Sequence, residues 1–283
     1  MLVSAGRWML RRGAPDHRHL SIGLALGGGF ARGIAHVGVL RVFEERGIPI
    51  HAITGVSAGA IVAAAFASGM DTHEIEKLAG SMRFSDVARW TLSRLGLVTS
   101  ERMASFLKKL LRVHTFEQMR IPLGVVATDL RSGEAVLFRD RGDVIAPIRA
   151  SCSYPGLFLP VPIDGRMLVD GAMSQDVPTV STRSMGARRV ISVSLEAPSS
   201  VEDPKNMMHV VNRCFQILQK QTELDWRRRS DLVIEPDVSG FDWDGFSDTG
   251  ALIAAGRRAA EEAMPEIERW LGKAAEPVRV TAR

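Results

Sequence analysis

At residues 50–66 the chain reads IHAITGVSAGAIVAAAF. The apolar run over 50–54 predicts a buried strand, and the alanine-rich run after Gly59 predicts a helix, with Ser57 at the sharp turn between them. A serine at such a turn presents its Oγ off the backbone, and the positive end of the helix lies beneath it. Gly55 and Gly59 belong to this turn because strand and helix approach too closely there for a Cβ. The stretch predicts a nucleophile elbow centred on Ser57.

A second glycine-rich turn, GGGFARG, lies upstream at residues 27–33. It follows an apolar run over 21–26 that predicts a buried strand, and it precedes a helical pattern over 34–46. Together with the elbow this makes a β-α-β-α unit, in which the two strands are parallel, in most cases adjacent, and joined by a right-handed crossover. Because ligands bind at the carboxyl ends of parallel strands, we expect both turns to share one site.

The composition of this glycine loop suits an oxyanion hole. If the two strands are neighbours, the backbone N–H groups of the loop lie close to Ser57 Oγ, where they would stabilise the charge formed by attack on an ester carbonyl. Arg32 adds a positive charge at the rim, which suits a phosphate or another acidic head group.

The same loop has competing interpretations. A dinucleotide-binding turn also begins with G-x-G, but it needs an acidic residue at the end of the next strand, about 20 residues on, and here that strand ends in Thr54-Gly55. A phosphate-binding P-loop ends in Gly-Lys-Ser/Thr, whereas Gly33 is followed by Ile34-Ala35. A plain strand–helix turn needs fewer glycines. The oxyanion hole is therefore preferred, and a nucleotide-binding oxidoreductase is the weakest alternative.

A serine nucleophile needs a base, and two arrangements are open. Ser57, Asp170 and His209 follow the chain order of an α/β-hydrolase triad, but that fold places several strands before its serine and only two fit before Ser57. Asp170 instead ends the apolar run 166–169 beside Gly171, so its carboxylate projects from a strand end and could take the proton of Ser57 directly. Burial would raise the pKa of Asp170 above its usual value of about 4.

The remaining sequence alternates strands and helices, which predicts an α/β fold with helices on both faces of a sheet. Periodicity predicts helices at 73–82, 100–113, 144–151, 205–228 and 248–271, and strands at 123–128, 135–138, 166–169, 189–194 and 231–234. Hairpin turns are expected at 129–134 and at Asp164-Gly165. Residues 154–162 are expected to form an irregular apolar loop, because their prolines exclude a central strand.

Length and composition allow one large domain. The chain has 283 residues, of which 46% are hydrophobic and 24% charged, and we place a single domain at 20–273 between a basic tail at 1–19 and a C-terminal tail at 274–283. No apolar run reaches the ~18–20 residues that a membrane span requires. Two cysteines, Cys152 and Cys214, cannot make a disulfide framework and suit the cytoplasm.

The net charge of +4 and the pI near 9.4 favour an anionic partner, either lipid or nucleic acid. The sequence has no interleaved aromatic and basic stripe, no zinc-ligand spacing and no evident recognition helix, which argues against nucleic acid. The tail at 1–19 is expected to be a flexible basic segment, with an anchor on an anionic membrane surface as the alternative. The sequence therefore predicts a cytoplasmic location, with peripheral contact at the inner face of the membrane as the alternative.

Taken together, these motifs resemble the patatin-like phospholipase family, in particular its bacterial members and the acyl hydrolases related to neuropathy target esterase. The resemblance covers about residues 21–195. It is carried, in the order of that family, by GGGFARG at 27–33, GVSAG at 55–59 and DGA at 170–172. Arg149-Ala150-Ser151 followed by Pro155-Gly156-Leu157-Phe158 also looks like that family. Ala172 stands where many members have glycine.

The resemblance implies a three-layer α/β/α fold with a mostly parallel central sheet. It implies a catalytic dyad of Ser57 and Asp170 without a catalytic histidine, and an oxyanion hole made by the amides of Gly27, Gly28 and Gly29, with Arg32 nearby. The implied activity is hydrolysis of acyl esters in phospholipids or lysophospholipids through an acyl-enzyme, without calcium, another metal or a cofactor.

The acyl chain would run along the apolar loop at 155–162 and the helices within 71–120, where lipid tails find an apolar wall.

A third class of function stays open beside the hydrolase and the oxidoreductase, namely a regulatory protein that has kept a hydrolase fold without its activity.

Overall fold

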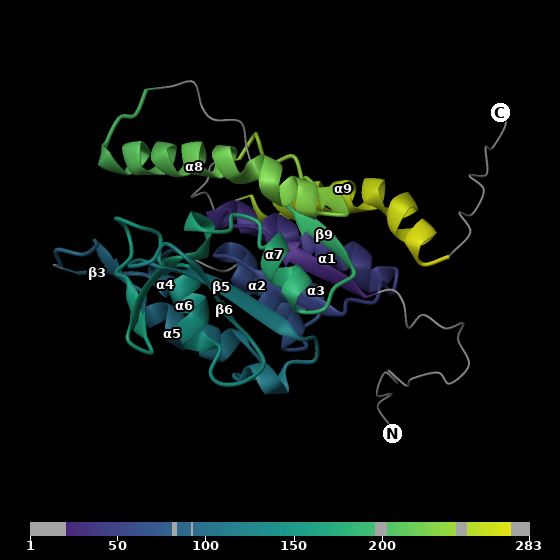
Figure 1. Cartoon of the computed structure of the whole chain (residues 1–283), viewed down its shortest axis with the longest axis horizontal. Coiled ribbons are helices and arrows are strands. Elements are labelled where there is room, and N and C mark those ends of the chain that lie inside the picture. The colour runs from purple at the N-terminus through teal and green to yellow at the C-terminus, as the bar shows by residue number, and fades with distance from the viewer. Residues whose placement is uncertain (1–20, 81–83, 92, 196–202, 242–247, 273–283) are drawn as a thin grey trace.

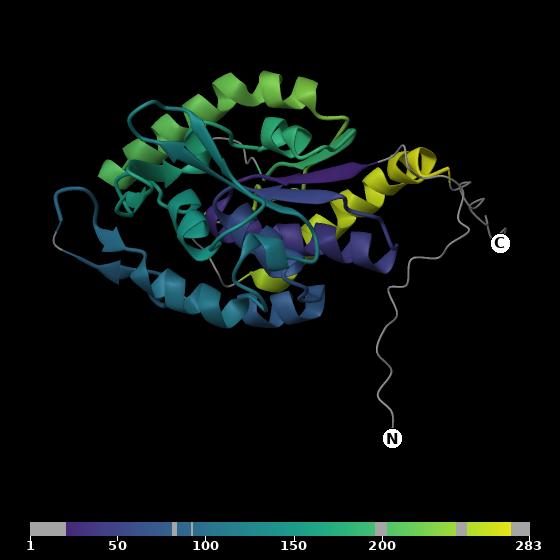
Figure 2. The same cartoon turned by 60° about the horizontal axis from the view of Figure 1, so that its bottom comes forward.

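The structure is a computed structural model, and it describes residues 21–80, 84–91, 93–195, 203–241 and 248–272. A central sheet lies between two helical layers, with α1, α2 and α9 on one face and α7 and α8 on the other (Figures 1 and 2). The α/β/α architecture expected from the sequence is thereby confirmed. The two tails, at 1–19 and 274–283, fall outside the described residues.

The strands are β1 Ile22–Leu26, β2 Ala52–Gly55, β3 Arg89–Trp90, β4 Val98–Thr99, β5 Leu123–Asp129, β6 Ala135–Phe138, β7 Val161–Ile163, β8 Arg166–Asp170, β9 Arg189–Val193 and β10 Leu232–Ile234. The α-helices are α1 Ala35–Glu45, α2 Ala58–Ala67, α3 Thr72–Ala79, α4 Phe84–Val87, α5 Glu101–Leu110, α6 Ile145–Ser151, α7 Thr179–Ser184, α8 Met207–Arg229 and α9 Thr249–Trp270. Short 3-10 turns are η2 Phe30–Ile34, η3 Phe116–Gln118 and η4 Gly171–Met173. No helix in these described ranges is long and apolar enough to cross a bilayer.

The main sheet has the strand order β10-β9-β1-β2-β5-β8-β7, with β6 added to β5. Strands β10, β9, β1, β2 and β5 are mutually parallel, whereas β6, β7 and β8 run antiparallel to their neighbours. Every residue of β1 and β2 is buried, as expected for parallel strands covered by helices on both faces.

This topology brings three chain turns to one place. The register pairs Leu26 with Gly55, so the loops after β1 and β2 leave the sheet side by side. Strand β5 continues beyond that edge, and β8 returns antiparallel along it with Asp170 opposite Ala127, whereas Gly55 is opposite Val125. The carboxyl end of β8 therefore reaches the carboxyl end of β2 from the opposite direction.

The predicted elements are confirmed to within a few residues, and the differences concern short segments. Residues 161 and 162, expected at the end of an irregular loop, instead belong to the edge strand β7. Pro162 is tolerated there because an edge strand can leave one side of its backbone without a ladder partner. Helix α7 and the β3–β4 hairpin were not predicted from the sequence, since a helix of six residues and strands of two residues are too short to show a period.

Two glycines allow α9 to pack directly on α1. A Cβ on Gly256 would lie 1.9 Å from the Ala35 carbonyl oxygen, and one on Gly38 would lie 2.0 Å from that of Ile253. The helix backbones are thus in contact at this crossing, which fixes the position of α1 behind the glycine loop.

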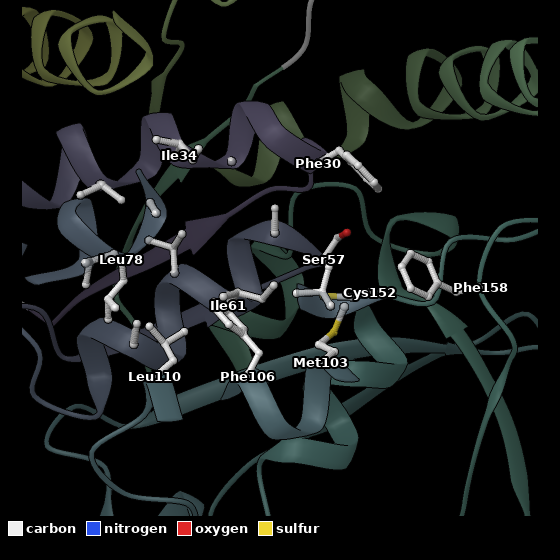
Figure 3. Close-up of a pocket in the computed structure, with 18 residues that line it drawn as sticks. Phe30, Ile34, Ser57, Ile61, Leu78, Met103, Phe106, Leu110, Cys152 and Phe158 are labelled. Carbon is white, nitrogen blue, oxygen red and sulfur yellow. The ribbon is translucent and has the colours of Figure 1, made fainter. Parts of the chain in front are cut away.

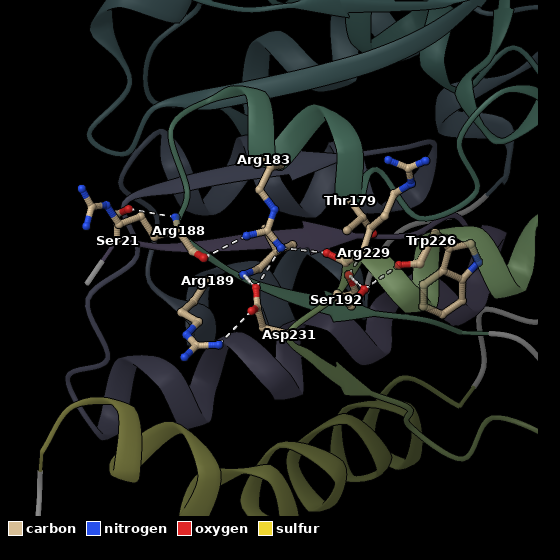
Figure 4. A network of polar contacts seen from close by, with 11 residues as sticks. Ser21, Thr179, Arg183, Arg188, Arg189, Ser192, Trp226, Arg229 and Asp231 are labelled. Carbon is tan, nitrogen blue, oxygen red and sulfur yellow. Dashed lines mark hydrogen bonds and ion pairs between the residues drawn. The ribbon is translucent and has the colours of Figure 1, made fainter. Parts of the chain in front are cut away.

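The C-terminal end of α8 is tied to the sheet by a polar network around Asp231 (Figure 4). Its carboxylate accepts hydrogen bonds from Arg183, Arg189 and the Val190 amide at 2.8–2.9 Å. Arg183 also donates to the carbonyl of Arg229, the last residue of α8, at 2.8 Å. These contacts hold the helix in place across the face of the sheet.

Candidate active site

The elbow has the strained backbone that the sequence predicts. Ser57 has φ +52°, in the left-handed region that non-glycine residues rarely adopt, and it immediately precedes α2. A Cβ on Gly55 would lie 2.4 Å from Ala60 Cα, and one on Gly59 would lie 2.4 Å from the Gly27 carbonyl oxygen. Both positions are therefore closed to any side chain.

A hydroxyl from another element holds the backbone of the serine. The amide of Ser57 donates to Ser151 Oγ at 2.8 Å, and Ser151 is fully buried at the end of α6. The sequence marked Ser151 only as part of a family-like motif and gave no role to its side chain. This contact joins α6 to the elbow and offsets part of the strain at the serine.

Asp170 is buried beside the serine. It is 1% exposed, and its Oδ1 accepts a hydrogen bond from the Ala172 amide at 2.9 Å, within the tight turn that Gly171 permits. Burial and, more weakly, the charge of Asp176 raise its pKa to about 7, while hydrogen bonds from the Ala172 amide and the Ser57 side chain oppose that rise. Ser57 and Asp170 therefore line the same cavity, and the pKa of the carboxyl group is raised to about 7.

The amides of the glycine loop are only partly available to a ligand. The Gly27 amide donates to the Val193 carbonyl at 3.0 Å, and the Gly28 amide donates to the Asp176 carbonyl at 3.2 Å. The expectation that Gly27, Gly28 and Gly29 all offer their amides therefore needs correction, since the neighbouring β9 and the turn after β8 use the first two.

Two other amides are better placed. Within the described residues, neither the Gly29 nor the Ala58 amide donates to a backbone carbonyl. Ala58 follows the nucleophile at the N-terminus of α2, the position that supplies an oxyanion-hole donor in other nucleophile elbows. The sequence analysis did not single out Ala58, although its place directly after the serine would have identified it.

Arg32 is held by the protein itself. Its Nε and Nη2 donate to the carbonyl oxygen of Phe241 at 2.9 and 2.6 Å. The guanidinium lies beside the glycine loop, as expected, but it is engaged with the backbone of a distant segment. The expected role as a cation that meets an acidic head group is thereby weakened.

No histidine of the described chain lines either cavity around Ser57. His36 is fully buried behind the loop, and its Nε2 lies 2.9 Å from the Gly27 carbonyl oxygen. Because a carbonyl only accepts, Nε2 carries the proton of this hydrogen bond. Burial lowers the pKa of His36 to about 4. His209 is exposed on α8, where its Nδ1 accepts from the Lys205 amide at 3.3 Å. His17 and His19 lie outside the described residues.

An apolar cavity begins at Ser57 and encloses about 870 Å³, part of it open to solvent. Figure 3 shows the serine hydroxyl toward one end, with Ile61, Phe106 and Leu110 receding from it. Side chains from α2, α3 and α5, together with Phe158, line this cavity, which places the helices and the apolar loop singled out in the sequence along its wall. Burial raises the pKa of the adjacent Cys152 thiol, so that thiol stays protonated beside the serine.

A second, polar cavity of about 880 Å³, part of it open to solvent, lies under α8 and shares Ser57 with the first. Its wall includes the glycine loop, Asp170 and Asp176, and the α8 side chains Asn212, Gln216 and Gln219. Sequence reasoning missed Asp176 and the contribution of α8. No three His, Cys, Asp or Glu side chains gather into a metal-holding group anywhere in the described ranges.

Comparison with known proteins gives the same picture. A family model described as patatin-like phospholipase matches residues 24–182. An uncharacterized NTE family protein of Mycobacterium tuberculosis is 35% identical over 199 residues, which are 68% of this chain and 55% of that protein. A second NTE family protein of the same organism is 30% identical over 282 residues, covering 88% of this chain and 48% of that protein. The chain thus spans about half the length of these relatives.

Two further matches extend the comparison. Lysophospholipase NTE1 of Mycosarcoma maydis is 30% identical over 231 residues, which are 78% of this chain but 12% of that protein. The crystal structure of VipD from Legionella pneumophila aligns with a TM-score of 0.53 at 16% identity, covering 88% of this chain and 67% of that one. This last likeness is one of fold.

Proposed function

The chain belongs to the patatin-like phospholipase family, and from that premise we propose that it is a serine lipid acyl hydrolase with Ser57 as nucleophile and Asp170 as base. The observation that carries the proposal is a buried carboxyl group beside the serine at the elbow, on the wall of the same cavity, with a pKa that burial raises to about 7. A general base of that pKa is half ionised near neutral pH, where proton transfer from a hydroxyl is most effective.

In the first step, Ser57 Oγ attacks the acyl carbonyl while Asp170 takes its proton. The carbonyl oxygen becomes negatively charged, and it is stabilised by the Gly29 amide and by the Ala58 amide at the positive end of α2. The intermediate collapses as Asp170 returns the proton to the alcohol oxygen. The alcohol leaves, and the acyl group stays on Ser57 as an ester.

In the second step, Asp170 takes a proton from a water molecule, and the resulting nucleophile attacks the acyl ester. The same amides hold the second oxyanion. Collapse releases the fatty acid, and the proton returns from Asp170 to Ser57 Oγ. Backbone amides supply the positive field in both steps, so the proposed reaction needs no calcium.

Phospholipids or lysophospholipids are the proposed substrates. The apolar cavity suits the acyl chain, because it begins at Ser57 and is walled by aliphatic and aromatic side chains. The relative from Mycosarcoma maydis is named a lysophospholipase, which agrees with this substrate class.

Such lipids lie in membranes, and we place the protein at the cytoplasmic surface of a bilayer through α8. Its outward face exposes apolar side chains at helical spacing, including Met207 (65% exposed), Ile217 (52%) and Leu224 (65%). Arg213 and Lys220 flank them and would face anionic lipid head groups. The opposite face of the same helix covers the polar cavity. Contact of the outward face with a membrane would therefore bring the site close to the lipid.

Fatty-acid release from a lysophospholipid and from a nitrophenyl ester tests the proposal. Wild-type protein should hydrolyse both, and Ser57→Ala should lose about 10³-fold or more of kcat with an unchanged circular dichroism spectrum. Full activity of Ser57→Ala would refute the assignment of the nucleophile. A folded wild-type protein without activity on any acyl ester would favour the regulatory alternative.

A further inference from the structure

We propose that the β3–β4 hairpin enters the surface of an anionic phospholipid bilayer and delivers lipid from it to the apolar cavity at Ser57. The inference rests on the proposed hydrolase function and deepens it, because it names the element through which the acyl chain leaves the membrane. The partner is a lipid surface, which the hairpin meets with the side chains of Trp90, Arg94 and Leu95.

The hairpin carries exposed apolar side chains that contribute little to the core. Trp90 is 72% exposed, the highest value for a large apolar side chain within the described ranges, and Leu95 is 63% exposed. Strands β3 and β4 form a two-stranded sheet of their own, apart from the main sheet, and they project from the body of the molecule (Figures 1 and 2). An exposed tryptophan is favoured at a membrane interface, where its ring lies at the level of the head groups.

Both ends of the hairpin leave from the wall of the apolar cavity. On one side, Val87 lines that cavity two residues before β3 begins. On the other side, α5 begins two residues after β4 ends, and its Met103 and Phe106 line the same cavity. A lipid held by the hairpin would therefore lie next to the space proposed for the acyl chain.

Backbone contacts fix the hairpin to a third part of that wall. The amides of Leu97 and Val98 both donate to the Leu157 carbonyl at 2.9 Å. Val98 also forms a parallel bridge with Phe158, whose side chain lines the cavity at the same end as Ser57 (Figure 3). Because an isolated two-stranded hairpin is at best marginally stable in water, these contacts hold it in a fixed orientation to the site.

The charge of the hairpin suits an anionic surface. The chain has no acidic residue between Asp86 and Glu101, whereas Arg89 and Arg94 lie between them. Arg89 forms an ion pair with Glu101 at 3.3 Å, which offsets its charge at the base of the hairpin. Arg94 is exposed near the tip. A cation beside a bilayer that contains anionic lipid strengthens binding by about fivefold, and here it would meet phosphate groups while the apolar side chains enter below them.

The hairpin and the start of α8 lie at the same end of the molecule in both views (Figures 1 and 2). Met207, the first residue of α8, is 65% exposed, and Val210, almost one turn later, is 48% exposed. A bilayer that meets this end of α8 can therefore meet the hairpin as well. The two elements have different consequences, since α8 adds apolar contact area and the hairpin joins that contact to the acyl cavity.

Tryptophan fluorescence tests the insertion without any catalysis. Ser57→Ala protein is mixed with vesicles of phosphatidylcholine and phosphatidylglycerol that carry a nitroxide quencher on their acyl chains, and it is compared with the same protein carrying Trp90→Phe. We expect the vesicles to quench a component of the emission that Trp90→Phe removes, because the indole ring would lie within reach of the labelled chains. Equal quenching of the two proteins would overturn the inference.

Fatty-acid release is the second measurement, from unlabelled vesicles that contain lysophosphatidylcholine and from a soluble nitrophenyl ester. Leu95→Ser should lower the rate on vesicles by about tenfold and leave the rate on the soluble ester unchanged, since the hairpin does not contact the reacting atoms. The matched control is Leu130→Ser at the β5–β6 turn, where a leucine that is 58% exposed does not line the cavity. The control should change neither rate, and equal losses on vesicles in the two variants would contradict the proposed role of the hairpin.

Arg94→Gln tests the charge of the lipid surface. It should lower the rate by about fivefold on vesicles that contain phosphatidylglycerol, and it should have no effect when phosphatidylcholine is the sole carrier lipid. The same loss on both kinds of vesicle would overturn the assignment of an anionic surface.

A second copy of this chain is the other occupant that the hairpin could take. A wild-type dimer in light scattering that Leu95→Ser abolishes would assign the hairpin to a protein contact and overturn the inference. Failure of the underlying function gives a different result, in which no ester is hydrolysed or Ser57→Ala is as active as the wild type. The fluorescence comparison decides the insertion of Trp90 in either case, because it does not depend on turnover.

Discussion

At the scale of single residues, the site depends on holding Ser57 in an unfavourable conformation. Its positive φ is maintained by the bond from its amide to Ser151 Oγ and by the absence of side chains at Gly55 and Gly59. Strain of this kind, about 1–3 kcal/mol, persists only where the surroundings enforce it. The serine is therefore positioned by residues that never touch substrate.

Ser151→Ala should lower kcat by about 10- to 100-fold with little change in KM, because a buried amide loses its acceptor at a cost of about 1–3 kcal/mol and the nucleophile is released from its alignment. The matched control is Ser153→Ala, since the Ser153 hydroxyl is equally buried but donates to the Arg149 carbonyl at 2.9 Å. Steady-state kinetics on a soluble ester would measure both. Equal losses of kcat in the two variants would contradict a positioning role for Ser151.

Asp170 links activity and stability to pH. The folded-state pKa of about 7 lies above the usual value of 3.8, so the native protein binds more protons than the unfolded chain between about pH 4 and pH 7. The contribution of Asp170 to the free energy of unfolding therefore falls as pH rises through this window. Over the same window the base becomes ionised, and kcat/KM should rise toward a plateau above about pH 7.

Asp170→Asn should consequently be more stable than the wild type at pH 8, by roughly 1–4 kcal/mol, with the difference vanishing below about pH 4. The same variant should lose about 10²–10⁴-fold in kcat. Urea unfolding at the two pH values measures the first effect and ester hydrolysis the second. A variant less stable than the wild type at pH 8 would show that the buried carboxylate is not under strain.

At the scale of elements, glycines allow α1 and α9 to cross with their backbones in contact. Gly256→Ala should destabilise the fold by about 3 kcal/mol, because its Cβ would meet the Ala35 carbonyl. Gly250→Ala, near the start of the same helix, has open space around it and should change stability by a gain of at most about 1 kcal/mol. Urea midpoints compare the two, and similar midpoints would argue against backbone contact at the crossing.

Helix α8 has two roles in this account, since one face lines the polar cavity and the other is proposed to contact lipid. Replacing Ile217 and Leu224 together by glutamine should reduce co-sedimentation with anionic phospholipid vesicles by about tenfold, because each outward side chain adds apolar area to the lipid contact. Hydrolysis of a soluble monomeric ester should be unchanged. Val180→Gln, on α7 and 44% exposed, is the control for loss of a surface apolar side chain. Undiminished vesicle binding by the double variant would remove α8 from the interface.

At the scale of the whole molecule, local sequence was sufficient for the β-α-β-α unit and the elbow. Strands β1 and β2 are short buried runs, and the glycine-rich turns after them are visible in the sequence. Only Gly55 is required by a near neighbour, Ala60, whereas a Cβ on Gly59 would meet the carbonyl oxygen of Gly27. Asp170 was also predictable, because it ends an apolar strand next to a glycine. Its proximity to Ser57, in contrast, depends on the antiparallel return of β8 along β5, which the spacing of residues does not reveal.

The remaining features depend on contacts between distant segments. The Gly27 amide donates to the Val193 carbonyl and the Gly28 amide to the Asp176 carbonyl. The Arg32 side chain donates to the Phe241 carbonyl. In each case the two partners are more than a hundred residues apart. A composition of glycines and one arginine predicts donors and a cation but cannot show which of them the protein itself uses. For the same reason the amide-lined face of α8 was not predicted as part of the site.

The most direct test of the Ser57–Asp170 dyad is the rate of covalent labelling by a fluorophosphonate, with the modified residue mapped by mass spectrometry. We expect the wild type and His209→Ala to be labelled at Ser57 at the same rate, and Asp170→Asn to react at least about 10²-fold more slowly while still folded. Labelling of folded Asp170→Asn at the wild-type rate, or of a residue other than Ser57, would contradict the account.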